Sequence, residues 1–237
     1  MLAGRSNLAL RVVSSLVVAP LAVLIAYLGG WPFDLFWGIA ALIVFCEWAM
    51  LVRGRNSAAS SWSTAQLLWM GGGLAYAAAM LTATVTLRAD VTHGLAAILF
   101  LFAVVWMTDI TAYFAGRAFG GPKLMPKVSP KKTWSGAIGG TLGGVIGALL
   151  VAHFAGIGNL AAVGAIALVL SVVSQAGDLL ESAIKRRFDA KDSSGLLPGH
   201  GGLMDRLDGF ATAVVAAAVI GVAHGGLDAP ARGLLEW

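Results

Sequence analysis

Long apolar runs dominate this chain, and most of them are about as long as a lipid bilayer is thick. Seven runs can be read along the sequence, at residues 8–28, 33–52, 64–87, 92–115, 136–155, 160–180 and 210–223. A transmembrane helix needs about 20 consecutive, mostly apolar residues. The pattern therefore predicts an all-α polytopic membrane protein with about seven transmembrane helices, within a range of six to nine.

The first run resembles a secretory signal peptide, because Arg5 and Arg11 lie at its start. It is longer than the apolar region of a signal peptide, and no small-x-small cleavage motif follows it. We therefore interpret residues 8–28 as a retained helix.

The basic residues fall almost entirely on one side of this predicted topology. If the N-terminus is cytoplasmic, all of the 16 Lys and Arg except Arg88 and Arg232 lie on the cytoplasmic side, as the positive-inside rule expects. The composition agrees, since 58% hydrophobic and 12% charged residues lie outside the usual range of soluble domains. A basic face beside anionic lipid head groups explains the net charge of +4 without a nucleic-acid partner.

The chain divides into two regions of different chemistry. Residues 1–100 carry few charges in their spans, and we expect them to serve packing, dimerisation or lipid access. Residues 101–237 carry two long cytoplasmic loops, 116–135 and 182–207, and the candidate chemistry. Gly140 and Gly144, four positions apart, predict close helix–helix packing. We interpret Glu47, near the end of the second run, as an interfacial acid that snorkels or pairs with Arg53.

The first polar cluster is the stretch "WMTDITAYFAGRAFGGPKLMPKVSPKKTWSG". Asp109, Tyr113 and Arg117 are spaced at i, i+4 and i+8, so a helix places them on one face. An acid on that face is costly in lipid and should point into a bundle or cavity. Either a structural network around Arg117 or a functional site explains Asp109 at this stage.

The same cluster ends in "SPKKTWSG", directly before a predicted helix. Lysines, hydroxyls and free N–H groups at a helix start suit a polyphosphate, although the spacing of a P-loop is absent. A positive-inside loop is the alternative explanation of these lysines. The candidate residues are Ser129, Lys131, Lys132 and Thr133.

The second polar cluster begins in "SQAGDLLESAIKRR". Gln175, Asp178, Ser182 and Lys185 lie close to one helical stripe, and Glu181 flanks it. Asp178 lies deep in its span, so it belongs to a proton or ion path or binds a metal ion, with a purely structural role as the weaker alternative.

A glycine-rich turn follows, in which Pro198, Gly199, Gly201 and Gly202 surround His200. These residues exclude a regular helix and let backbone approach a ligand. After the turn, Asp205 and Asp208 are spaced at i and i+3. Together with Asp178 they would suit one or two Mg²⁺ ions that also bind substrate phosphates. Nearby cations would neutralise the remaining phosphate charge, namely Lys185, Arg186, Lys191 and Arg206.

The stretch "SAIKRRFDAKDSSGLLPGHGGLMDRLD", residues 182–208, resembles the signature of the phosphatidate cytidylyltransferases, also called CDP-diacylglycerol synthases. The segments "QAGDLLES", "SPKKTWSG" and "WMTDITAYFAGRAFG" also resemble the family, so the resemblance covers about residues 105–210. It implies that CTP and phosphatidate give CDP-diacylglycerol and pyrophosphate, with Mg²⁺, in phospholipid biosynthesis. It further implies a homodimer in the cell (inner) membrane, with its active site on the cytoplasmic side.

The resemblance also implies roles for individual residues. Asp178 and Asp205 would be the principal metal-binding acids, with Asp208 beside them. Phosphates would be bound by Lys131, Lys132, Lys185, Arg186, Lys191 and Arg206. The site would be lined by Ser129, Thr133, His200, Gly201, Gly202 and Asp109. One departure is Ser135, where many members carry Glu or Gln.

Three other functions are alternatives to this assignment. A CDP-alcohol phosphotransferase should show D-G-x-x-A-R, but "DGFATAVV" at Asp208 lacks the Arg. An ion-coupled transporter would use buried Asp109 and Asp178, but it explains neither the H-G-G turn nor the loop cations. A related enzyme acting on another lipid phosphate, such as that of an isoprenoid ether lipid, stays open.

Overall fold

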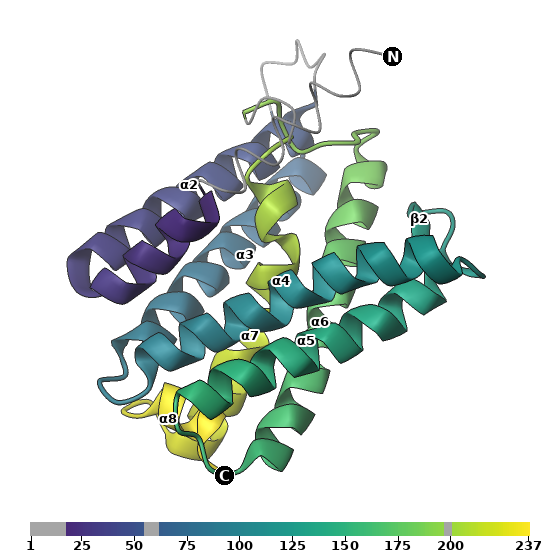
Figure 1. Cartoon of the computed structure of the whole chain (residues 1–237). Coiled ribbons are helices and arrows are strands. Elements are labelled where there is room, and N and C mark those ends of the chain that lie inside the picture. Colours follow the sequence, from purple (N-terminus) through teal and green to yellow (C-terminus); the bar gives the residue numbers. More distant parts are fainter. Residues whose placement is uncertain (1–17, 55–61, 197–200) are drawn as a thin grey trace.

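The computed structural model describes residues 18–54, 62–196 and 201–237, and it is mostly helical (Figure 1). Six helices are long and apolar enough to cross a membrane: α2 (Gly30–Arg53), α3 (Thr64–Ala89), α4 (Gly94–Phe119), α5 (Trp134–Phe154), α6 (Leu160–Arg187) and α7 (Met204–Gly225). A shorter apolar helix, Val18–Leu28, precedes α2, and the short α8 (Pro230–Leu235) ends the chain. The count of about seven spans stays a prediction, because the first predicted run lies partly outside the described residues.

The two predicted cytoplasmic loops are shorter than the sequence suggested. Helices α4 and α6 continue to Phe119 and Arg187, and α7 already begins at Met204. The first loop also forms a small antiparallel sheet, in which β1 (Lys123–Met125) pairs with β2 (Ser129–Thr133). Within the described residues this β-hairpin is the only sheet, and it places the two lysines of "SPKKTWSG" on a strand.

Helices α4 and α5 form a tightly packed hairpin, side by side in Figure 1. A Cβ atom at Gly140 would lie 2.9 Å from the Thr108 carbonyl oxygen, and one at Gly144 would overlap the Thr108 hydroxyl. Only glycine lets the two backbones approach this closely. The prediction of close packing at these glycines is confirmed.

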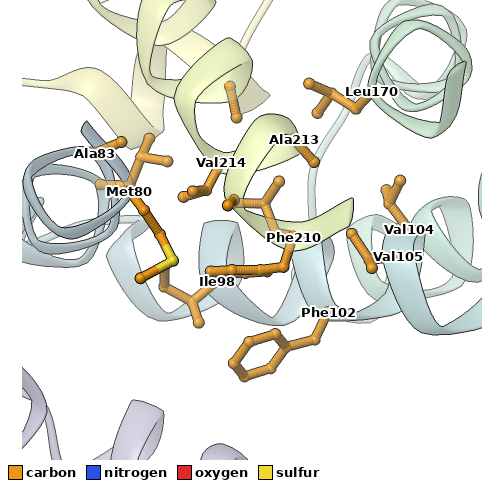
Figure 2. Close-up of a cluster of buried hydrophobic side chains, with 14 of the residues drawn as sticks. Met80, Ala83, Ile98, Phe102, Val104, Val105, Leu170, Phe210, Ala213 and Val214 are labelled. Carbon is orange, nitrogen blue, oxygen red and sulfur yellow. The ribbon is translucent and has the colours of Figure 1, made fainter. Parts of the chain in front are cut away.

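Helix α7 lies at the centre of the bundle and packs against α2, α3, α4 and α6. Figure 2 shows Phe210 and Val214 of α7 among buried side chains of α3 and α4, including Met80 and Ile98. The Phe210 ring also stacks on Trp37 of α2, with 4.8 Å between ring centroids. The apolar face of α7 is therefore held on several sides from its second turn onward.

The long helices alternate in direction, so the loops gather at two ends of the bundle (Figure 1). One end holds the C-termini of α2, α4 and α6. The β1–β2 hairpin and the segment before α7 lie at the same end. All described Lys and Arg lie toward this end except Arg88 and Arg232. The asymmetry expected from the sequence is therefore present in the fold, and we call this the basic end.

Candidate functional site

An ion pair joins the two polar clusters of the sequence at the basic end. The Lys132 ammonium group of β2 contacts the Asp178 carboxylate of α6, and both side chains keep roughly a third of their surface exposed (28% and 30%). The Ser182 hydroxyl, one turn after Asp178, lies 3.4 Å from the same carboxylate. The sequence predicted both charged residues as site residues but not their pairing, which requires the hairpin to fold back over α6.

Two further acids belong to the surroundings of Asp178. Asp208 of α7 interacts electrostatically with Asp178, with Glu181 and, more weakly, with Asp109. Asp109 of α4 in turn interacts with Asp178, Lys132 and Arg206. Three helices thus each contribute one carboxylate to a group that we call the acid group, consisting of Asp109, Asp178 and Asp208. Two cations, Lys132 and Arg206, accompany it.

Asp205 lies in a different environment, although it is only three residues before Asp208. Its side chain is 6% exposed, and Lys185 Nζ lies 2.5 Å from Oδ1. Its other oxygen accepts hydrogen bonds from the backbone N–H groups of Ser193 (2.9 Å) and Gly202 (2.8 Å). Lys185 also contacts Glu181, at 2.6 Å. Asp205 and Lys185 therefore belong to a buried ion network that ties α6 to α7.

The predicted metal-binding acids are consequently divided. Among residues 18–54, 62–196 and 201–237, no three acidic, histidine or cysteine side chains are grouped closely enough to hold a metal ion by themselves. Carboxylates such as those of Asp178 and Asp208 fit a hard cation that completes its shell with substrate phosphate oxygens and water. Protein donors approach the carboxylates of both Asp178 and Asp205, but Asp205 has four of them and Asp178 two, so Asp205 fits less well. The metal set stays a prediction.

The other predicted site residues are found in several environments. Lys131, Lys191 and Arg206 are exposed at the basic end, while Arg186, also exposed, donates a hydrogen bond to the Ala190 carbonyl at 2.8 Å. Lys185, by contrast, is 8% exposed. Of the six predicted phosphate-binding cations, four are therefore exposed, Lys132 is paired with Asp178, and Lys185 is buried.

The hydroxyl-bearing residues of the hairpin mainly shape the start of α5. The buried Thr133 hydroxyl accepts a hydrogen bond from the Gly136 N–H at 3.1 Å and so caps the helix. The Ser135 hydroxyl donates to the Gly120 carbonyl and closes the base of the hairpin. Ser129, the third, begins β2 and is half-buried.

The glycines of the signature are required by close contacts. Gly201 has φ of +84° and Gly202 leaves no room for a Cβ atom, which would meet the Glu47 carboxylate at 2.5 Å. His200 lies outside the described residues. The contact with Glu47 identifies a residue that the sequence interpretation missed. An acid inside an apolar run is itself a signal of function in a membrane protein, and that signal was available at Glu47.

The sequence is similar to those of known cytidylyltransferases. Residues 62–223 match the Cytidylyltransferase family. The chain is 42% identical to the phosphatidate cytidylyltransferase of Brucella abortus biovar 1 (strain 9-941), covering 88% of this chain and 91% of that protein. It is 40% identical to the phosphatidate cytidylyltransferase of Brucella suis biovar 1 (strain 1330), covering 95% and 97%. The enzyme of that name from Haemophilus influenzae is 39% identical, covering 76% and 63%.

Proposed function

The chain belongs to the cytidylyltransferase family and is a nucleotidyltransferase, and from that premise we propose that it converts CTP and phosphatidate to CDP-diacylglycerol and pyrophosphate. A phosphate oxygen of phosphatidate forms a bond to the α-phosphorus of CTP. The bond from that phosphorus to the bridging oxygen of the β-phosphate breaks, and pyrophosphate leaves with the electron pair. The observation that supports this best is the acid group, with Lys132 and Arg206 beside it, at the basic end of apolar helices.

We further propose that the protein crosses the cell (inner) membrane several times and works at its cytoplasmic side, as a homodimer. Six helices of sufficient length and the charge asymmetry between the two ends support the membrane assignment. CTP would approach the basic end from the cytosol, while the acyl chains of phosphatidate stay in lipid.

The attacking group needs no strong general base, because a phosphate oxygen is already a nucleophile. The difficulty is to bring two anions together in line. The exposed cations Lys131, Lys191 and Arg206 would lower this repulsion and orient the triphosphate. Lys132 would hold the Asp178 carboxylate in place at the edge of the same surface.

Asp178 and Asp208 are the residues that would hold Mg²⁺. When bound, Mg²⁺ would neutralise phosphate charge and stabilise the leaving pyrophosphate. Asp205 would join them only by exchanging its contact with Lys185.

The test is a transfer assay with purified full-length protein, CTP labelled at the α-phosphate, and phosphatidate in detergent micelles. We expect label to enter the lipid, EDTA to stop it, and Asp178→Asn to reduce turnover by at least a hundredfold. Asp34→Asn, an exposed acid at the opposite end, is the control and should behave as wild type.

The outcomes separate the parts of this proposal. If no label enters the lipid, cytidylyl transfer to phosphatidate is refuted, and the ion-coupled transporter becomes the leading hypothesis. Transfer that ignores EDTA, or an active Asp178→Asn variant, would refute the metal assignment alone. Faster transfer to an isoprenoid ether phosphate would reassign the lipid.

A further inference from the structure

Glu47 of α2 is a buried acid whose partners all come from the signature region. Glu47 is 1% exposed. Its carboxylate oxygens accept four hydrogen bonds from residues that lie 146 to 157 positions later in the sequence. The donors are Ser193 Oγ (3.0 Å), Ser194 Oγ (2.6 Å), Leu203 N (2.9 Å) and Met204 N (2.7 Å). A buried carboxylate is tolerated when it is hydrogen-bonded in this way.

The interpretation of Glu47 as an interfacial acid that snorkels or pairs with Arg53 is wrong, because its side chain is buried and bonded to other donors. The Arg53 guanidinium lies over the Trp62 ring instead, 5.8 Å from its centroid. Glu47 precedes Arg53 by more than a helical turn, and its side chain turns into the bundle toward α7. The four donors that decide its role are distant in sequence, and the spacing within one helix could not indicate them.

Glu47 supplies the N-terminal cap of α7. A helix start has backbone N–H groups without partners and a partial positive charge. The N-cap residue of α7 is Leu203, which offers no side-chain cap. The carboxylate of Glu47 accepts from Leu203 and Met204 in its place, so an acid on α2 fixes where α7 begins.

The same carboxylate also holds the segment on the other side of the glycines. Ser193 Oγ lies 3.0 Å from Glu47 Oε2 and 3.0 Å from Asp205 Oδ2, so its single hydroxyl proton is shared between the two carboxylates. Asp205 accepts from Ser193 N and Gly202 N as well. A Cβ atom at Gly202 would collide with Glu47 and Ser193, which explains why this position is glycine. Ser193 thus connects the Glu47 carboxylate directly to that of Asp205.

We propose that Glu47 is a positioning residue for cytidylyl transfer: it sets the orientation of the first turns of α7, which carry Asp205, Arg206 and Asp208. This inference rests on the proposed function, because the acids it positions are those assigned to that reaction. Glu47 does not touch the reacting atoms. It acts by fastening both described sides of the signature turn to α2, and this gives the N-terminal region a part in catalysis.

The decisive variant is Glu47→Gln, which keeps the shape but removes two of the acceptor positions that face N–H and O–H donors. Asp90→Asn is a matched control. Asp90 is also a buried carboxylate that accepts backbone N–H groups, from Thr92, His93 and Arg232, but it lies at the opposite end of the bundle. Both variants should lower the melting temperature of the purified full-length protein.

Only Glu47→Gln should lower kcat, by about 10- to 100-fold with a nearly unchanged KM for CTP, at a temperature where both variants are folded. Ser193→Ala removes the bridge but leaves the cap on α7, so it should lower kcat with a smaller change in melting temperature. It also replaces Glu47→Gln as the test if that variant does not fold. A kcat for both Glu47→Gln and Ser193→Ala equal to that of Asp90→Asn would overturn the proposal.

Limited trypsin digestion gives a readout that does not depend on the reaction. Arg187 and Lys191 are exposed cleavage sites just before Ser193 and Ser194, which Glu47 holds. We expect Glu47→Gln, but not Asp90→Asn, to be cut there faster than wild type. If wild type transfers no nucleotide but this difference in cleavage is seen, the proposed reaction is refuted, whereas the role of Glu47 in holding the signature turn against α2 is supported. If Glu47→Gln is as resistant to trypsin as wild type, Glu47 does not hold the signature turn in place.

Discussion

Replacing Lys185 by methionine tests the ion network that joins α6 to α7. The Lys185 ammonium lies 2.6 Å from Glu181 and 2.5 Å from Asp205. These carboxylates are only 2% and 6% exposed. Methionine retains much of the apolar stem but leaves two acids facing each other with little water to separate them.

The magnitude follows from the distances. At an effective dielectric constant near 20, two unit charges about 2.6 Å apart attract by about 6 kcal/mol. Desolvation of the ions offsets most of this attraction, so the pair itself contributes much less. Removing one partner is different, because the remaining buried charge loses its compensation, at a cost of about 3–5 kcal/mol. For a chain of this size we expect a fall in melting temperature on the order of 10 °C.

The assay is thermal unfolding of the purified protein in a fixed detergent. Lys191→Met, an exposed lysine in the same stretch, should melt close to wild type. Adding Glu181→Gln to Lys185→Met should restore part of the lost stability, because one of the two facing charges is removed. An unchanged melting temperature for Lys185→Met, or a double variant less stable than the single one, would refute the reasoning.

Three further predictions concern packing, pH and substrate. Gly144→Val should lower the free energy of unfolding by about 1–3 kcal/mol, because the valine side chain must displace the Thr108 hydroxyl. Gly71→Ala, with no neighbour within 4 Å of the added Cβ atom, should leave the stability unchanged. Equal effects of the two substitutions would contradict the close packing at Gly144. Burial raises the pKa of Asp90, but hydrogen bonds from backbone N–H groups outweigh it and leave the pKa below its ordinary value. The stability that Asp90 contributes is therefore present above about pH 4 and lost as the pH falls further, so melting curves of wild type and Asp90→Asn should converge there. Lys131→Ala should raise the KM for CTP several-fold with kcat retained, and an unchanged KM would leave this lysine only its part in the charge asymmetry.

Much of the fold follows from local patterns that need no tertiary information. A run of about 20 apolar residues must satisfy its backbone polar groups internally and becomes a helix, and six of the predicted runs are long helices. The close packing at Gly140 and Gly144 was equally readable, since small residues four apart line one face of a helix. The ends of the elements were less accurate, because "KRR" after a span continues α6 instead of beginning a loop.

The candidate site was predicted as a set of residues but not as an arrangement. Asp178 and Lys132 were both named, yet their pairing depends on a hairpin that brings β2 over α6. Asp205 and Asp208 were expected to face one way, whereas the network around Lys185 draws Asp205 away from the acid group.

The sequence by itself determined that apolar helices carry a basic, acid-containing surface and which stretches supply it, because composition and periodicity are properties of each segment alone. Only the tertiary structure decided which charge meets which. Glu47 is the clearest case: its partners lie 146 to 157 residues away, and no local pattern encodes a contact between α2 and the start of α7. The free energy of a buried carboxylate depends on the donors around it, and those donors are assembled only when the helices pack.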